Sequence, residues 1–360
     1  MNKDAEPIMN GYNIAFTNIN RQYQDLKSEI LEITDQVLQS GQLMDGPYTN
    51  KFEQWLADRN QCRHAVTCHS GTQALQIIAE YILAGQTGKS ARVAIPALTF
   101  PATANAWILA GWEIELVDVD DYGLMLTDTI DQESVSAVCM VGLYGHALTN
   151  SMTHPMLIED AAQHWLSNNC LRQGLASALS FDPTKNLNNY GNGGAVVTNN
   201  DDLAAFARNW IGHGKFTQHR QAGSNSRLSE IDCAQLLIKT KYLDQWQARR
   251  RHIAEYWYKQ LLDCACRPLI DQTNIDLHGI QKFVVEVPFQ QRIQNHLLAH
   301  GIETKVHYVN GLDKLPMLQA ANYCANAGRL ANFIISLPIY SELTDTEVEF
   351  IIDRVLDCVS

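Results

Sequence analysis

The sequence predicts an α/β protein built on a mainly parallel sheet with helices on both faces. Short apolar segments alternate with helical ones over residues 64–200, and this alternation is typical of βαβ units. The chain has 360 residues, of which 46% are hydrophobic, so it can bury a large core and form two domains. We expect a large α/β domain over residues 1–245 and a smaller α+β domain over residues 246–360.

The N-terminal part is predicted to be helical. Apolar residues recur at three- and four-residue spacing from Tyr23 to Val37, which indicates one amphipathic helix. Gly41 follows as the expected C-terminal stop. After a short turn, a second helix should bury Phe52 and Leu56 on one face.

The strands of the predicted sheet are short apolar segments that end in turns. They lie near residues 65–68, 93–95, 114–118, 136–143, 156–159, 178–181 and 195–198. Ligands of such sheets bind beyond the carboxyl ends of the strands. Thr72, Phe100, Asp160 and Lys185 all follow such ends, so we expect them at one edge of the sheet.

The smaller domain is predicted from a second group of segments. A long helical run over 229–262 should lead into it, and strands are expected at 283–287 and 333–337. A helix is expected over 290–300, and another ends the chain. The helix over 290–300 has His296 and His300 one turn apart. No third ligand is evident, so we expect no metal site.

Composition excludes several classes of partner. The net charge is −12, which argues against nucleic acids and anionic membranes. The nine cysteines are scattered, a pattern that suits reduced thiols better than disulfides. Residues 1–12 are polar, and no apolar run reaches membrane-spanning length, so we expect a cytoplasmic protein.

Lys185 is the main candidate for chemistry. It follows a short apolar strand, Ser180 lies upstream of it, and Asp160 ends the preceding strand. The amine of such a lysine can form a Schiff base once desolvation or a nearby cation lowers its pKa. The alternative is an ordinary exposed lysine in a loop.

A second candidate site lies at Ser70-Gly71-Thr72, between a strand and a helix. The free N–H groups and the positive end of the helix dipole favour a phosphate there. The alternative is that the hydroxyl residue only caps the helix.

Three motifs resemble the cofactor site of the DegT/StrS-type sugar aminotransferases. These are fold-type-I enzymes that depend on pyridoxal 5′-phosphate (PLP) and act on nucleotide-linked keto sugars. The motifs are Ser-Phe-Asp-Pro-Thr-Lys-Asn-Leu at 180–187, Glu-Asp-Ala-Ala-Gln at 159–163 and Gly-Gly-Ala-Val-Val-Thr at 193–198. The resemblance extends from about Tyr12 to the end of the chain.

The resemblance implies a role for each matched residue. Lys185 would form the internal aldimine with PLP and then move a proton as the general base. Asp160 would keep the pyridine nitrogen protonated, and Gln163 would bond to the phenolic oxygen of the ring. The remaining cofactor contacts would come from Gly71, Thr72 and Ser180 at the phosphate and from Phe100 stacked on the ring, for which core packing is the alternative.

The resemblance also implies partners. Asn225 would reach the phosphate in the neighbouring subunit of a homodimer, and His307 and Tyr308 would face the sugar nucleotide. The implied reaction moves an amino group from L-glutamate to a nucleotide-linked keto sugar. Two alternatives stay open: an aminotransferase for small amino or keto acids, and a regulatory homologue that binds PLP without turnover. Departures from the family motifs, such as Ser224 and Ser226 beside Asn225, leave the substrate's identity open.

Overall fold

The computed structural model describes residues 13–86, 91–148, 152–167, 174–318 and 323–359. Residues 1–12, whose polar composition contributed to the prediction of a cytoplasmic protein, lie outside these ranges. Within the described ranges, no helix is both long enough and apolar enough to cross a bilayer.

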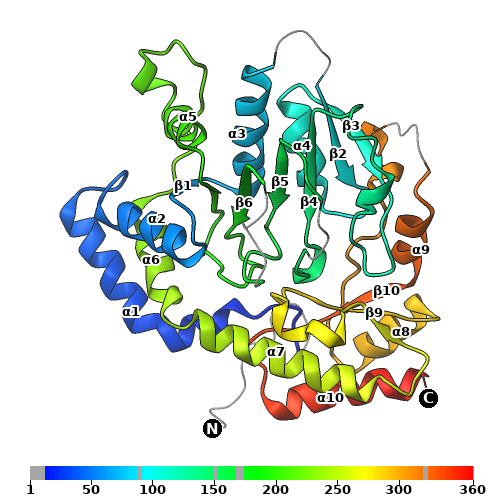
Figure 1. Cartoon of the computed structure of the whole chain (residues 1–360). Coiled ribbons are helices and arrows are strands. Elements are labelled where there is room, and N and C mark those ends of the chain that lie inside the picture. The colour runs from blue at the N-terminus through cyan, green and yellow to red at the C-terminus, as the bar shows by residue number, and fades with distance from the viewer. Residues whose placement is uncertain (1–12, 87–90, 149–151, 168–173, 319–322, 360) are drawn as a thin grey trace.

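The large sheet has seven strands in the order β1-β7-β6-β5-β4-β2-β3 (Figure 1). Strands β2 to β6 run parallel, whereas β7 is antiparallel to both β6 and β1. The prediction of a mainly parallel sheet is therefore confirmed. The strands are β1 (His64–Cys68), β2 (Arg92–Pro96), β3 (Glu113–Val117), β4 (Ala137–Val141), β5 (Leu157–Asp160), β6 (Ala176–Ser180) and β7 (Gly194–Thr198).

Both faces of this sheet are covered, because neighbouring strand residues enter different cores. Val66 and Val196 pack in one apolar cluster with α3, α4 and α5. Ala65 and Val197 pack in another cluster with α2 and α6. The covering helices are α2 (Pro47–Arg59), α3 (Gly71–Ala84), α4 (Pro101–Leu109), α5 (Asp201–Ile211) and α6 (Glu230–Thr240). Strands buried on both faces explain why the sequence shows continuous apolar runs.

The first helix ends where the sequence predicts. Helix α1 (Ile19–Ser40) is followed by Gly41, which has a φ of 67° and donates its N–H to the carbonyl of Leu38. This left-handed conformation is one that glycine adopts without steric cost. Helix α1 packs along α6 through a small cluster that contains Leu26, Ile30 and Ile238.

The long helical run predicted over 229–262 is two helices, α6 and α7 (Leu243–Gln260). Lys241 and Tyr242 lie at the break, and both donate hydrogen bonds to the carboxylate of Glu29 in α1. The helical pattern of the sequence continues through the break, and no proline or glycine lies there. The two helices separate at the point where the chain contacts α1.

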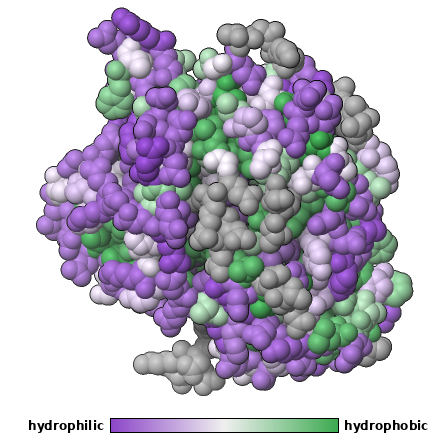
Figure 2. All heavy atoms as spheres, viewed as in Figure 1, coloured by the Kyte–Doolittle hydropathy of each residue, from purple (hydrophilic) through white to green (hydrophobic). Residues whose placement is uncertain are grey.

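A second, three-stranded antiparallel sheet has the order β10-β9-β8. Figure 1 shows this sheet beside α7, α8 and α10. Its apolar core contains residues of these helices and also Ile14, which precedes α1. The elements are β8 (Arg267–Pro268), β9 (Phe283–Glu286), α8 (Gln290–Ala299), α9 (Ala325–Phe333), β10 (Ile334–Leu337) and α10 (Asp345–Val359). The domain boundary between residues 245 and 246 would fall inside α7 and stays a prediction. On the face shown in Figure 2, polar residues predominate over α1 and α2.

Candidate active site

A cavity of about 530 Å³ lies where the ends of the parallel strands meet the C-terminal part of the chain. It brings together residues from the large sheet, from the starts of two helices and from segments outside the strands of the smaller sheet. All of the predicted site residues except Asn225 line it: Gly71, Thr72, Phe100, Asp160, Gln163, Ser180, Lys185, His307 and Tyr308. The residues that follow parallel strands thus meet at one edge, as expected from the rule that the carboxyl ends of such strands form one binding edge.

Lys185 lies in the turn that follows β6. Its N–H donates to the carbonyl of Asp182 at 2.9 Å, and the side chain of Asp182 accepts from the N–H and hydroxyl of Thr184. Burial lowers the pKa of the Lys185 amine, while the carboxylates of Asp160 and Asp182 oppose that shift. A lysine with a lowered pKa is a better nucleophile and base near neutral pH than an exposed one.

Asp160 ends β5, is buried, and is held by two donors. The hydroxyl of Thr103 donates to Oδ2 at 2.7 Å, and the N–H of Ala162 donates to Oδ1 at 3.2 Å. Thr99 lies 3.0 Å from the Thr103 hydroxyl and continues the network. Sequence reasoning missed Thr103. The signal for it was its spacing of one helical turn from Thr99, beside Phe100.

Gln163 is 5% exposed, so it is not a surface side chain that simply faces solvent. Its Oε1 accepts from the N–H of Tyr144 at 2.8 Å, and its Nε2 donates to the hydroxyl of Tyr308 at 3.0 Å. The Tyr144 hydroxyl in turn donates to the carbonyl of His307. Burial raises the pKa of Tyr308, so its phenol is neutral at physiological pH. This network ties the end of β5 to the segment that carries His307 and Tyr308.

The start of α3 forms another corner of the cavity. Ser70 caps this helix, because its hydroxyl accepts from the N–H of Gln73 at 3.2 Å. The capping alternative is thus confirmed for Ser70, while Gly71 and Thr72 line the cavity beside Ser180. The backbone N–H groups of this first turn have no partners within the helix, which suits an anion.

Phe100 is 55% exposed although it lies at the cavity. Core packing, the alternative for this residue, is therefore wrong. Its ring is 5.9 Å from the ring of Tyr308 and tilted by 42°. An aromatic side chain without a packed neighbour on one face can stack on a flat ligand.

His307 and Lys282 complete the wall on the side of the C-terminal sheet. Nδ1 of His307 lies 2.8 Å from the Ser336 hydroxyl. Burial, together with the positive charges of Lys282, Lys305 and Lys185, lowers the pKa of His307 to about 2, so the imidazole is neutral. Sequence reasoning missed Lys282, which belongs to no motif and simply precedes an apolar strand.

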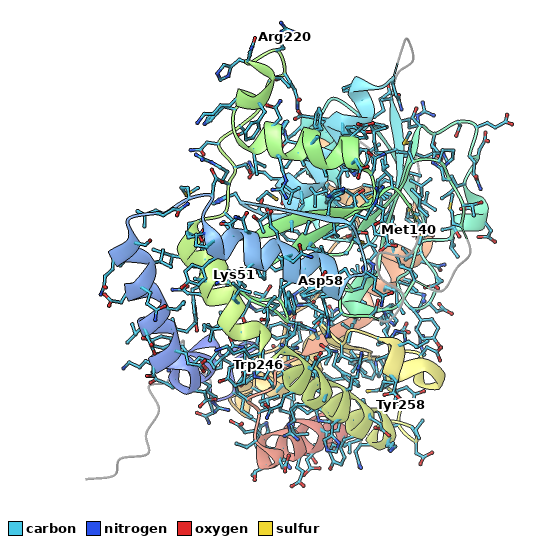
Figure 3. All side chains as sticks on the ribbon, turned by 60° about the vertical axis from the view of Figure 1, so that its left-hand side comes forward. Lys51, Asp58, Met140, Arg220, Trp246 and Tyr258 are labelled. Carbon is cyan, nitrogen blue, oxygen red and sulfur yellow. The ribbon has the colours of Figure 1, made fainter. Side chains whose placement is uncertain are left out.

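Asn225 does not line the cavity of its own chain. It is exposed, and its backbone pairs with that of Gly212 at the base of a loop over 212–225. This loop extends away from the body of the protein, with Arg220 near its tip (Figure 3). The cross-subunit role of Asn225 stays a prediction.

Comparison with known proteins gives consistent matches. The model of the DegT/DnrJ/EryC1/StrS aminotransferase family matches residues 24–356. The pleiotropic regulatory protein of Geobacillus stearothermophilus is 30% identical, over 96% of this chain and 98% of that protein. The UDP-2-acetamido-2-deoxy-3-oxo-D-glucuronate aminotransferase of Pseudomonas aeruginosa is 29% identical, over 94% and 98% respectively. The crystal structure of S. venezuelae DesV in complex with a ketimine intermediate superposes with a TM-score of 0.86 at 26% identity, over 97% of this chain and 99% of that one.

Proposed function

We propose that this chain, which belongs to the DegT/DnrJ/EryC1/StrS aminotransferase family, moves an amino group from L-glutamate to a nucleotide-linked keto sugar. It is an aminotransferase, and its cofactor is PLP, on which this family depends. The name of the P. aeruginosa relative, which states a nucleotide-linked oxo sugar, supports the sugar substrate. The observation on which the proposal rests is that Lys185 and Asp160 open onto one cavity with the start of α3.

The corner at the start of α3 fits the phosphate of the cofactor. The backbone N–H groups of Gly71 and Thr72 and the positive end of the helix dipole would bind it, and the hydroxyl of Ser180 would add a donor. A Cβ atom built on Gly71 would lie 2.9 Å from Cβ of Ser180. Glycine therefore allows α3 and β6 to approach closely enough to form this corner.

The opposite part of the cavity fits the ring. When bound, the cofactor supplies an electron sink for the pair that remains when the Cα–H bond of the amino donor breaks. Asp160, fixed by Thr103, would hold a proton on the pyridine nitrogen. Phe100 would cover one face of the ring, and Gln163 would donate to its phenolic oxygen.

Lys185 would act twice. Its amine would first hold the cofactor by a bond to the aldehyde carbon, whose oxygen would leave as water. Once the amino donor displaces it, the free amine would take the proton from Cα of the donor and deliver it to that same carbon of the cofactor. The lowered pKa of Lys185 supports this role, because only the neutral amine can accept a proton.

We also propose a cytoplasmic homodimer in which Asn225 completes the neighbouring site. Asn225 is exposed and lies off the cavity wall of its own chain. Phe216, in the same loop, is 80% exposed, and such an apolar side chain suits burial against a second copy. The cysteines among the described residues are free thiols, which supports a reducing compartment.

The test is the visible absorption spectrum of the protein with PLP, before and after L-glutamate is added. We expect a band from the cofactor on Lys185 that glutamate bleaches and that a nucleotide-linked keto sugar restores. Lys185→Ala should abolish both changes. Restoration by simple 2-oxo acids, with kcat/KM above that for every keto sugar tested, would overturn the sugar assignment.

A regulatory role is the second candidate, because the G. stearothermophilus relative is named a regulatory protein. It predicts that PLP binds and gives the absorption band, but that neither glutamate nor other amino acids change it. That result, obtained with a panel of amino donors, would replace the proposed enzymatic function.

A further inference from the structure

Lys282 is a second lysine on the wall of the cavity. It comes directly before β9 and is 8% exposed. Its Nζ donates to Oε1 of Gln281 at 2.6 Å, and Nε2 of Gln281 donates to the carbonyl of Thr184 at 2.9 Å. Thr184 is the neighbour of Lys185 in the chain. Two hydrogen bonds therefore hold the Lys282 amine in a defined place near the turn that presents Lys185.

The charges around Lys282 are mainly positive. No ion pair found among the described residues includes it, although Lys305 nearby pairs with Glu303. Burial holds the pKa of Lys282 well below its usual range, and the positive charges of Lys185 and Arg250 lower it further, whereas Asp182 opposes them. Burial without a carboxylate partner therefore favours the neutral amine of Lys282 over its ammonium form in the empty cavity. An anion from a ligand would favour the ammonium form again and complete the site.

A lysine ammonium has three donors, and only one is accounted for by Gln281. The remaining donors can bind an anion that enters the cavity beside Lys185. A phosphate already has a matching corner at Gly71, Thr72 and Ser180, which belong to other elements of the wall. A carboxylate is the anion that the proposed reaction brings next to the reacting carbon, because Cα of an amino-acid donor carries one.

We propose that Lys282 binds a carboxylate group of the substrate next to the carbon at which Lys185 moves the proton. This inference rests on the proposed aminotransferase function. The carboxylate comes either from the amino-acid donor or from a keto sugar that is a uronic acid. Both sources present the same chemistry, so the experiment has one arm for each.

The variants are Lys282→Met, which removes the charge at similar length, and Lys282→Gln, which keeps a neutral donor. Lys305→Met is the matched control, because this exposed lysine lies near the site but not on the cavity wall. The first arm measures kcat/KM for L-glutamate in the first half-reaction. The second compares a nucleotide-linked keto sugar that has a C6 carboxylate with one that has a C6 hydroxymethyl group. Calorimetry of glutarate binding to the PLP-loaded protein gives a readout that needs no turnover.

We expect Lys282→Met to lower the affinity for glutarate and kcat/KM for glutamate by about 10- to 100-fold, the loss typical of a charge-assisted hydrogen bond. For Lys282→Gln, the glutarate affinity and kcat/KM should lie between those of Lys282→Met and wild type. Lys305→Met should change each value by less than about threefold. A loss confined to the uronic acid would assign the carboxylate to the sugar.

The proposal is overturned if Lys282→Met has the same kcat/KM values as wild type in both arms and gives the same result in the glutarate titration. This holds whether or not wild type binds glutarate. If wild type transaminates normally in that case, the proposed function survives alone. If wild type binds glutarate through Lys282 but never exchanges the amino group, the carboxylate site stands and the aminotransferase function fails. Lys282→Met should fold, because it replaces a buried amine, which forms no ion pair with the described residues, by an apolar side chain of similar length.

Discussion

Gly71→Ala tests how closely the start of α3 approaches the end of β6 at the cavity. The added methyl group would lie 2.9 Å from Cβ of Ser180 and 3.2 Å from the carbonyl oxygen of Leu179. Two carbon atoms do not approach so closely, so α3 must shift away from the end of β6. Strand β6 itself is held on both sides by β5 and β7. Overpacking of this kind costs about 1–3 kcal/mol.

We therefore expect Gly71→Ala to lower the free energy of unfolding of the cofactor-free protein by about 1–3 kcal/mol. It should also weaken PLP binding, because the N–H groups at the start of α3 move with the helix. Urea unfolding followed by circular dichroism gives the first value, and titration of PLP absorbance gives the second. Gly328→Ala in α9 is the control. Its new methyl group would meet only the Tyr323 hydroxyl at 4.0 Å, so it should stabilise the protein by about 0.5–1 kcal/mol.

A double-mutant cycle isolates the steric overlap between the new methyl group at position 71 and the side chain of Ser180. Ser180→Gly removes the atom that the new methyl group meets, so the double variant should be more stable than the sum of the two single changes by about 1 kcal/mol. Additive changes would refute the proposed contact. Equal unfolding midpoints for Gly71→Ala and wild type would refute the steric argument itself.

Other outcomes test the supporting network, a buried charge and the dimer. Thr103→Val removes the hydroxyl that donates to Asp160 and should lower the free energy of unfolding by about 1–2 kcal/mol; an unchanged urea midpoint would contradict this. Burial lowers the pKa of Lys239 to about 7, so from about pH 7 to 9 the unfolded state binds a proton that the native state lacks. The stability of wild type relative to Lys239→Met should therefore rise with pH in that window, and a constant difference in urea unfolding would count against it. Mixing the Lys185→Ala and Asn225→Ala proteins should restore up to about a quarter of wild-type activity, because half of the dimers are mixed and each has one intact site. No recovery after subunit exchange would exclude the cross-subunit role.

Much of the fold could be predicted because its signals are local. The spacing of apolar residues defined α1, and Gly41 marked its end. Short apolar runs predicted the strands, and the alternation with helices predicted their parallel arrangement. The break between α6 and α7 could not be predicted, because it coincides with contacts to Glu29 in a helix far away in the sequence.

In the candidate site, too, some residues could be predicted from the sequence and others depend on distant contacts. Lys185, Asp160 and Ser180 were found because their motifs resemble those of a known family. Lys185 and Asp160 also follow the ends of predicted parallel strands, and such ends meet at one edge. The hydrogen bond between Gln163 and Tyr308 joins segments that are distant in the sequence, and Lys282 comes to the cavity from a third such segment. No periodicity or motif encodes these pairs, since they exist only when the C-terminal sheet packs against the large one.

The sequence by itself determined that several chain segments meet at one edge of the sheet, because strands that alternate with helices form a mainly parallel sheet whose carboxyl ends lie together. Only the tertiary structure decided which side chains from distant segments close the cavity, and with what charge. Those contacts depend on how two separate apolar cores are packed together, and burial between them is what moves the pKa of Lys185 and Lys282 away from their ordinary values.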